Sequence, residues 1–226
     1  MIIPELFVLS IVTFVGLCFG SFVTLASYRL PRGGNIFIAR SECPSCITLL
    51  TARDLIPLAS WLLAKGKCRH CGAAVSIRYP LTEIVTALWF VWIYSLFGLT
   101  PFTFILMGMA VLLMILIVAD LELYIIPDTV HIGLIVLAAI DIAFHVRNGS
   151  EMLIGGAIGL GIGLIMSVGY LSVMKKPGLG FGDVKFLAVS GLWLGPIDLI
   201  PYLTLAGILG TFSAFAWRMM GKGRYF

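Results

Sequence analysis

The residues best suited to chemistry are two aspartates that lie next to apolar segments. Asp183 follows a stretch with glycine at every second position, namely Gly178, Gly180 and Gly182, and a long apolar segment begins directly after it. Asp120 ends another apolar segment. A carboxylate at the end of a membrane-spanning segment is unfavourable unless a partner or water is near, so such a residue often has a function.

A facing pair of aspartates at low polarity has a specific chemistry. Such a pair shares one proton, because both carboxylates cannot be ionised at once. The ionised group activates a water, and the protonated group polarises a peptide carbonyl. This is the reaction of aspartyl proteases, and we predict Asp120 and Asp183 as the catalytic pair. Gly178, Gly180, Gly182 and Lys185 are predicted to form the loop that approaches an extended substrate.

A plainer interpretation of these acids stays open. Each aspartate alone is compatible with a helix cap or a charge at the membrane interface. Asp128 is interpreted as a residue that favours the N-terminal dipole of the next helix, and Glu122 as a solvated loop charge. Lys185 is compatible with an ion pair to Asp183 or with extension to the lipid headgroups.

A cysteine cluster lies in the polar stretch near the N-terminus. It consists of two CxxC pairs separated by 21 residues: Cys43, Cys46, Cys68 and Cys71. Two such pairs are typical of a structural four-thiolate Zn²⁺ site, whereas redox chemistry of a CxxC pair is the competing interpretation. His70 is predicted to be a surface residue and not a ligand, and Cys18 a buried residue without a metal.

The composition places these groups in a membrane protein. The chain has 226 residues, of which 60% are hydrophobic and 12% are charged, and its mean hydropathy is +1.08. A soluble domain carries about 25% charged residues, so the sequence predicts an all-α polytopic membrane protein that contacts the lipid bilayer. The net charge of +4 does not indicate nucleic-acid binding. The sequence does not indicate whether the protein is a monomer or an oligomer.

The apolar segments predict about seven transmembrane helices, with the cysteine insert between helices 1 and 2. They cover residues 6–28, 81–97, 102–120, 129–145, 152–174, 183–195 and 197–217. The predicted domains are a first transmembrane helix at 1–28, a four-cysteine module at 29–80 and a transmembrane aspartyl peptidase domain at 81–226. Gly16, Gly20 and Ser21 are predicted to pack closely against another helix.

Basic residues predict the orientation of these helices. They gather in the insert, the loop at 174–185 and the C-terminal tail: Arg29, Arg32, Arg40, Arg53, Lys65, Lys67, Arg69, Arg78, Lys175, Lys176, Lys185, Arg218, Lys222 and Arg224. Only Arg147 lies on the other side in a seven-helix arrangement. Because basic loops face the cytoplasm, the insert and the C-terminus are predicted inside and the N-terminus outside. Asp120 and Asp183 then lie on the same cytoplasmic side.

The motifs and their order resemble those of the prepilin peptidases, also called type IV leader peptidases, which are GxGD intramembrane aspartyl proteases. The resemblance covers nearly the whole chain. It is carried by residues 20–31, the two CxxC pairs, residues 54–57, 66–71 and 78–80, Glu83, Asp120 with Pro127 and Asp128, and residues 180–185.

The resemblance implies a bacterial inner-membrane enzyme of a type IV pilus or type II secretion system. Its substrates would be prepilins or pseudopilins, cleaved after a short basic leader at the cytoplasmic face. Many members also methylate the new N-terminus with S-adenosyl-L-methionine, and for this the resemblance suggests the region of Asp54, Gly66 and Glu83. No glycine fingerprint for that cofactor is visible in the sequence, so methyl transfer is implied by the resemblance alone.

The sequence departs from the family pattern at three points. Thr24 stands where the family usually has asparagine, Glu122 stands where it often has aspartate, and many members have eight spans. Three alternatives remain at this point: a peptidase without methyltransferase activity, a transporter or channel with a zinc-stabilised insert, and an assembly factor that binds pilins without cutting them.

Overall fold

The computed structural model describes residues 2–36, 38, 40–144, 147–175 and 178–219. Within these ranges the fold is all-α, as predicted, and its only β-pairing consists of two isolated bridges. The elements are α1 (Ile2–Arg29), η1 (Leu30–Arg32), η2 (Ala52–Asp54), α2 (Ala59–Leu63), α3 (Arg78–Phe97), α4 (Pro101–Leu123), α5 (Asp128–Ala143), α6 (Gly149–Met174) and α7 (Phe181–Met219). Lys176, Lys222, Arg224 and residue 145, which the sequence analysis used, lie outside the described residues.

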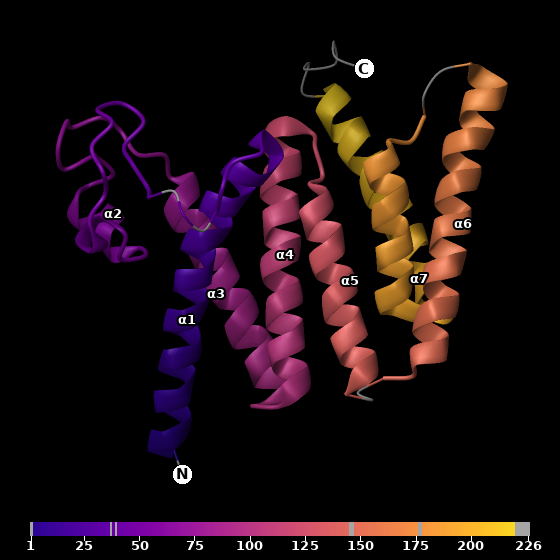
Figure 1. The fold of residues 1–226 in the computed structure, drawn as a ribbon, viewed down its shortest axis with the longest axis horizontal. Coiled ribbons are helices and arrows are strands. Elements are labelled where there is room, and N and C mark those ends of the chain that lie inside the picture. Colours follow the sequence, from indigo (N-terminus) through magenta and orange to yellow (C-terminus); the bar gives the residue numbers. More distant parts are fainter. Residues whose placement is uncertain (1, 37, 39, 145–146, 176–177, 220–226) are drawn as a thin grey trace. The chain divides into compact units, whose positions relative to one another are not determined.

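The chain forms two compact units, residues 1–141 and 142–226. In the first unit, α1, α3 and α4 pack on one another, and the insert with α2 lies at the end of the unit where α1 ends and α3 begins (Figure 1). Because α3 and α4 run in opposite directions, α4 ends at that same end (Figure 1). The insert and the last turn of α4 therefore lie at the same end of this unit.

Two glycines of α1 let it approach α3 closely. A Cβ atom on Gly16 would lie 2.7 Å from the Cα of Ala87, and one on Gly20 would lie 2.4 Å from the Cα of Glu83. Real side chains do not reach such distances, so these positions require glycine for packing. The predicted packing surface at Gly16 and Gly20 is confirmed, and its partner is α3.

The second unit consists of α6 and α7, which lie side by side (Figure 1). The helix α7 is interrupted at Gly195, where φ is 76° and ψ is 178°, directly before Pro196. Figure 1 shows that the chain reverses its direction there, so the two parts of α7 are antiparallel. The predicted boundary between the segments at 183–195 and 197–217 is confirmed as this break.

A glycine face on α6 makes close packing with α7 possible. A Cβ atom on Gly155 would lie 2.2 Å from the carbonyl oxygen of Gly191, and one on Gly159 would lie 2.3 Å from that of Leu187. These glycines are four residues apart and so lie on one face of the helix. Small residues at such a face allow the van der Waals contacts that hold helices together in a membrane.

We expect Gly159→Ala to lower the stability of the protein by about 1–3 kcal/mol, because the added methyl group would overlap the backbone of α7. Gly161→Ala is the matched control, since a Cβ atom there meets nothing within 4 Å and alanine favours a helix by roughly 0.5–1 kcal/mol over glycine. Thermal unfolding in detergent measures both variants. Equal melting temperatures for the two would contradict this account of the packing.

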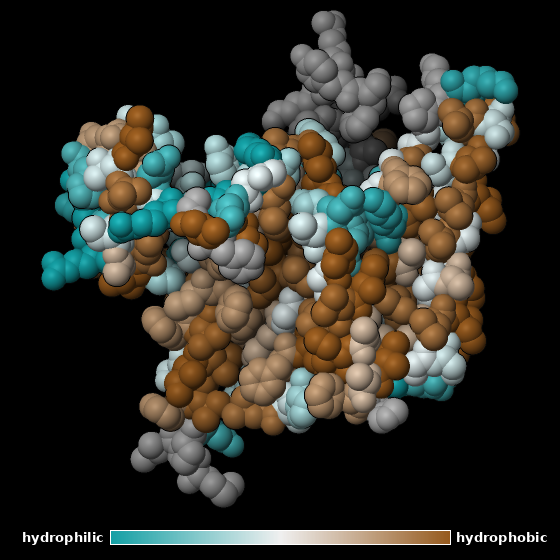
Figure 2. All heavy atoms as spheres, viewed as in Figure 1, coloured by the Kyte–Doolittle hydropathy of each residue, from teal (hydrophilic) through white to brown (hydrophobic). Residues whose placement is uncertain are grey.

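Each of the seven predicted spans coincides with a helix in the structure, except that α5 ends at Ala143 and that Gly195 has non-helical backbone angles. Among the described residues, five elements are long and apolar enough to cross a membrane: Glu5–Arg32, Arg78–Phe97, Pro101–Leu123, Gly149–Met174 and Phe181–Ser213. The fifth of these contains the break at Gly195 and so holds two predicted spans, whereas α5 has only 16 residues. Figure 2 shows hydrophobic side chains along the helices and hydrophilic ones on the insert and the helix ends.

The predicted division at residues 28 and 80 stays a prediction. Compactness divides the chain at residue 141, and it groups the insert with the helices that flank it. One prediction about a single residue is wrong: Cys18 is exposed on α1 and not buried. An apolar helix shows no polar face in its sequence, so the side that faces lipid is not evident from it.

Candidate functional site

Asp120 lies in the last turn of α4 and is exposed. The helix ends at Tyr124, which has a left-handed backbone with φ of 55° and donates its N–H to the carbonyl oxygen of Asp120 at 2.9 Å. The residues before Asp120 are buried, among them Val118 and Ala119. The carboxylate therefore stands at the boundary between a packed span and the polar loop that follows α4.

Asp183 lies in the first turn of α7 and is also exposed. The carbonyl oxygen of Gly180 accepts the N–H groups of Asp183 at 3.1 Å and of Val184 at 3.2 Å, which starts the helix. Val184 is buried and faces Gly163 of α6. The N-terminal dipole of α7 favours a negative charge at this position.

The glycine loop before Asp183 packs against the end of α6. A Cβ atom on Gly178 would lie 2.5 Å from the ring of Tyr170, so the loop backbone rests directly on this ring. Ser167 donates its hydroxyl to the carbonyl oxygen of Leu179 at 3.2 Å. Lys185 lies over the ring of Phe181 at 5.2 Å, a contact that neither of its two interpretations anticipated.

The two aspartates belong to different compact units, Asp120 to the first and Asp183 to the second. Each stands at the end of an apolar helix with an exposed carboxylate. Their pairing across the units stays a prediction, as does the role of the glycine loop.

The four cysteines of the insert come together and could hold a metal ion. The Sγ atoms of Cys43, Cys46, Cys68 and Cys71 all lie within 4.8 Å of one another, and those of Cys43 and Cys71 are 3.9 Å apart. A tetrahedral zinc with Zn–S distances of about 2.3 Å needs Sγ atoms roughly 3.8 Å apart. The cluster therefore fits a four-thiolate zinc site with little adjustment.

The two CxxC pairs form knuckles of the same construction. The N–H of Ile47 donates to the carbonyl oxygen of Cys43 at 2.8 Å, and the N–H of Gly72 donates to that of Cys68 at 2.9 Å. The bridges Glu42 to Leu49 and Lys67 to Ala74 close both knuckles in the same way. Ile47 has φ of 58° where the second knuckle has Gly72 with φ of 74°. A β-branched residue rarely adopts this conformation, so the first knuckle is the more strained one.

Backbone N–H groups prepare two of the thiols as ligands. The N–H of Cys46 lowers the pKa of Cys43, and the N–H of Cys71 lowers the pKa of Cys68. The N–H of Ala73 also favours the thiolate of Cys71, but desolvation and the neighbouring thiols outweigh it and raise the pKa of Cys71 to about 11. Four crowded thiolates repel one another, so a cation is the group that would stabilise them together.

Asp54 closes the turn before α2 and contacts the second knuckle. Its Oδ2 accepts the hydroxyl of Thr51 at 2.7 Å and the N–H of Thr51 at 3.0 Å, and these bonds lower the pKa of Asp54. Arg69 and His70 lie 3.7 Å and 3.8 Å from its carboxylate. His70 is exposed and outside the thiol cluster, as predicted. Asp54 thus has a structural role in the insert.

Gly66 occupies the turn that leads into the second knuckle. Its φ is 68°, and a Cβ atom would lie 3.0 Å from the ring of Trp61. The N–H of Val75 donates to the carbonyl oxygen of Gly66 at 2.8 Å, and Trp61 Nε1 donates to that of Val75 at 3.0 Å. Both the backbone angle and the ring contact favour glycine here.

Glu83 connects the insert to the membrane helices. It is only 6% exposed on α3, beside Gly20 of α1. Its Oε2 accepts the N–H of Leu58 at 2.6 Å, and Leu58 itself has φ of 59°. A buried carboxylate that holds a strained loop is a structural contact, and the part of Asp54, Gly66 and Glu83 in methyl transfer stays a prediction.

An ion pair joins Arg78 and Glu122, and it was not predicted from the sequence. Glu122 was interpreted as a solvated loop charge, but it lies within α4 and is only partly exposed. Asp128 begins α5, in agreement with its interpretation as a helix N-terminal residue. The sequence did contain a sign of this ion pair. Arg78 precedes one apolar segment and Glu122 follows the next, so the two opposite charges come to the same end when these segments pack as an antiparallel pair.

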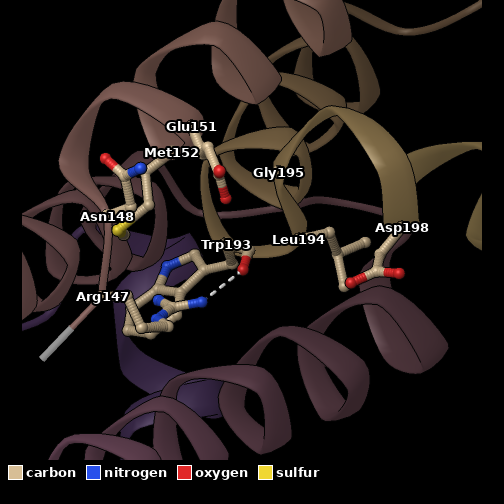
Figure 3. Close-up of a pocket in the computed structure, with 8 residues that line it drawn as sticks. All are labelled: Arg147, Asn148, Glu151, Met152, Trp193, Leu194, Gly195 and Asp198. Atoms are coloured by element: carbon tan, nitrogen blue, oxygen red, sulfur yellow. Dashed lines mark hydrogen bonds between the residues drawn. The ribbon is translucent and has the colours of Figure 1, made fainter.

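A cavity of about 320 Å³ lies in the second unit, between the start of α6 and the break in α7. Figure 3 shows Arg147 beside Trp193; its Nη1 donates to the carbonyl oxygen of Trp193 at 2.6 Å, and its guanidinium lies 4.9 Å from the ring centre. Glu151 and Asp198 also line the cavity. Its lining residues lie at the start of α6 and around the break in α7, whereas Asp183 lies in the first turn of α7, so the cavity is not part of the Asp183 loop. Arg147 thus supplies a hydrogen-bond donor to the carbonyl oxygen of Trp193, close to the break in α7.

The chain matches two family models that together cover most of its length. Residues 14–97 match the model described as the bacterial peptidase A24 N-terminal domain, and residues 107–215 match the type IV leader peptidase family. The first range contains the four cysteines, and the second contains both aspartates.

Three curated relatives illustrate the similarity. A prepilin leader peptidase/N-methyltransferase of Bacillus subtilis is 34% identical over 95% of this chain and 85% of the relative. A protein of the same name from Myxococcus xanthus is 35% identical over 87% of this chain and 59% of the relative. A type 4 prepilin-like proteins leader peptide-processing enzyme of Escherichia coli is 32% identical over 88% of this chain and 81% of the relative. No solved structure matches the chain significantly. The chain belongs to the type IV leader peptidase family.

Proposed function

We propose that the protein is a prepilin leader peptidase of the bacterial inner membrane, with Asp120 and Asp183 as its catalytic pair. The observation that carries this proposal is the family membership of the whole chain, together with the position of both aspartates. Each carboxylate is exposed at the end of an apolar helix, where a membrane-bound prepilin and water can both reach it. This membership also disfavours the transporter alternative.

In the proposed reaction the two carboxylates share one proton. The ionised one takes a proton from water, whose oxygen attacks the scissile carbonyl carbon, while the protonated one donates a hydrogen bond to the carbonyl oxygen. The glycine loop at 178–182 supports an extended substrate, since the backbone can approach where no side chain intervenes. Lys185, held over Phe181, would fix the other side of this loop.

Methylation of the new N-terminus is the second proposed activity. The names of the relatives from B. subtilis and M. xanthus support it, because they include N-methyltransferase. S-adenosyl-L-methionine would supply an electrophilic methyl group. The free amine of the cleaved pilin would form the new N–C bond as the bond from sulfur to the methyl group breaks, with S-adenosyl-L-homocysteine and a proton as the other products. We assign Asp54, Gly66 and Glu83 to the support of this step by resemblance, and they act in the structure through the folding of the insert.

Zinc is the proposed metal of the insert, held by Cys43, Cys46, Cys68 and Cys71. A closed set of four thiolates suits a structural ion and leaves no open position for substrate. The insert has little apolar core, so the metal would supply much of its folding free energy.

We also propose that the N-terminus faces outward, and that the insert and the C-terminus face the cytoplasm. The basic residues of the insert support this orientation. Protease treatment of inverted membrane vesicles tests it, since the insert should be cut there and protected in intact cells.

The experiment for the proposed function uses purified protein, a prepilin and S-adenosyl-L-methionine, with product masses as the readout. We expect loss of the leader and the gain of one methyl group on the mature pilin. Loss of the leader without the gain of a methyl group would mean that the protein is a peptidase without methyltransferase activity. Binding of prepilin without any cleavage would favour the assembly-factor alternative.

A further inference from the structure

An ion pair joins the first residue of α3 to the last turn of α4. The Nη1 of Arg78 contacts the Oε1 of Glu122, and the two side chains are 32% and 22% exposed. Arg78 Nε is buried and has no hydrogen-bond partner in the described part of the chain. The pair is thus partly shielded from water, where charge attraction is less screened than on an open surface.

Neither charge stabilises its own helix. Arg78 stands at the N-terminal end of α3, and Glu122 stands at the C-terminal end of α4. The helix dipole disfavours a cation at the first of these positions and an anion at the second. Each charge therefore has its favourable interaction with the other helix, and the ion pair stabilises the packing of α3 against α4.

This contact fixes the turn that carries Asp120. Glu122 is two residues further on, and two residues of an α-helix are separated by about 200° around its axis. When Glu122 is held against α3, Asp120 points away from α3, in agreement with its exposure. We propose that Arg78 and Glu122 are positioning residues that set the direction of the Asp120 carboxylate. This inference rests on the proposed function of Asp120.

Arg78 also links this turn to the cysteine insert. Only six residues separate it from Cys71. That segment is held by the bond from the Val75 N–H to Gly66 and by the bond from Trp61 Nε1 to Val75. A displacement of the second knuckle would therefore move Arg78, because the segment between them is short and held by hydrogen bonds. Through the ion pair with Glu122, it would also move the last turn of α4.

The test compares cleavage of a prepilin by full-length wild type, Arg78→Gln, Glu122→Gln, Arg78→Glu, Glu122→Arg and the charge-swapped double variant Arg78→Glu/Glu122→Arg. We expect each single variant to lower kcat up to about 100-fold with little change in KM, since a misplacement near 1 Å costs about that much. The double variant should recover most of the lost kcat. The conservative variant Glu122→Asp, which keeps the negative charge, should lose little kcat. Arg53→Gln and Glu5→Gln are charge-matched controls at exposed positions outside this ion pair and should cleave like wild type.

Two further readouts separate positioning from folding. Metal content and methylation of an already cleaved pilin should stay at wild-type values in Arg78→Gln and Glu122→Gln. Wild-type kcat in Arg78→Gln or Glu122→Gln would overturn the inference, as would a double variant no better than the single ones. A loss in Arg78→Gln that Glu122→Gln does not share would also overturn it. If wild type itself does not cleave prepilin, the proposed function fails and not this inference alone.

Discussion

Replacing Asp120 or Asp183 by asparagine is expected to abolish prepilin cleavage, with a loss of about 10⁴-fold in kcat. Asparagine has nearly the same shape, but it neither takes a proton from water nor supplies the shared proton. The backbone bonds that start α7 at Asp183 and end α4 at Asp120 do not involve the carboxylates. The variants should therefore fold normally and still bind substrate.

The two substitutions should not be additive. Both carboxylates act in one step, so removal of the second from an already inactive enzyme changes little. Product masses over a time course measure each single variant and the double variant. Asp198→Asn and Glu151→Gln are matched controls, because these acids line the cavity at the break in α7 and not the first turn of α7, which carries Asp183. Cleavage by both single variants would refute the aspartyl mechanism, and cleavage by one would remove that residue from the pair.

Replacing Cys43 by serine is expected to remove the metal from the insert and unfold it. Structural zinc in small modules supplies about 10–16 kcal/mol, more than a module of this size gains from its core. We expect about one zinc per chain in wild type and close to none in Cys43→Ser, measured by elemental analysis. Limited proteolysis should cut the variant within the insert, while the helices stay intact.

Cys18→Ser is the control, since this cysteine lies on α1 outside the cluster. It should retain the zinc of wild type. Acid should also release the metal, because protons compete with zinc for the thiolates and the affinity falls as the pH falls. Unchanged zinc in Cys43→Ser would refute the four-thiolate site. A wild-type protein without zinc, in which Cys43 and Cys46 form a disulfide, would favour the redox interpretation.

Several features could be predicted from local patterns. The spacing of the CxxC pairs predicted the cluster because a knuckle is a local turn, and two such turns supply four thiols for one ion. The apolar segments predicted the helices because a chain inside a bilayer must satisfy its backbone hydrogen bonds within itself. The exposure of Cys18 was not predictable, since a span that is apolar on all sides does not show which face meets lipid.

The partners of single residues were the part that needed the tertiary structure. Arg78 and Glu122 are far apart in sequence, and only the antiparallel packing of α3 and α4 brings them together. Glu83 and the N–H of Leu58 are also far apart in sequence, and they meet only where the insert folds onto α3. Gly16 and Gly20 were recognised as a packing surface, but their partners on α3 became evident only from the fold.

The sequence by itself determined the class of this protein, its four-cysteine cluster and its family, because these depend on residue type and spacing along the chain. Only the tertiary structure decided what holds the insert to α3 and what orients the last turn of α4. Those contacts arise where helix ends meet, and the position of a helix end depends on how whole helices pack. The carboxylate of Asp120 is thus specified by its motif, whereas its direction is set by an arginine 42 positions earlier in the chain.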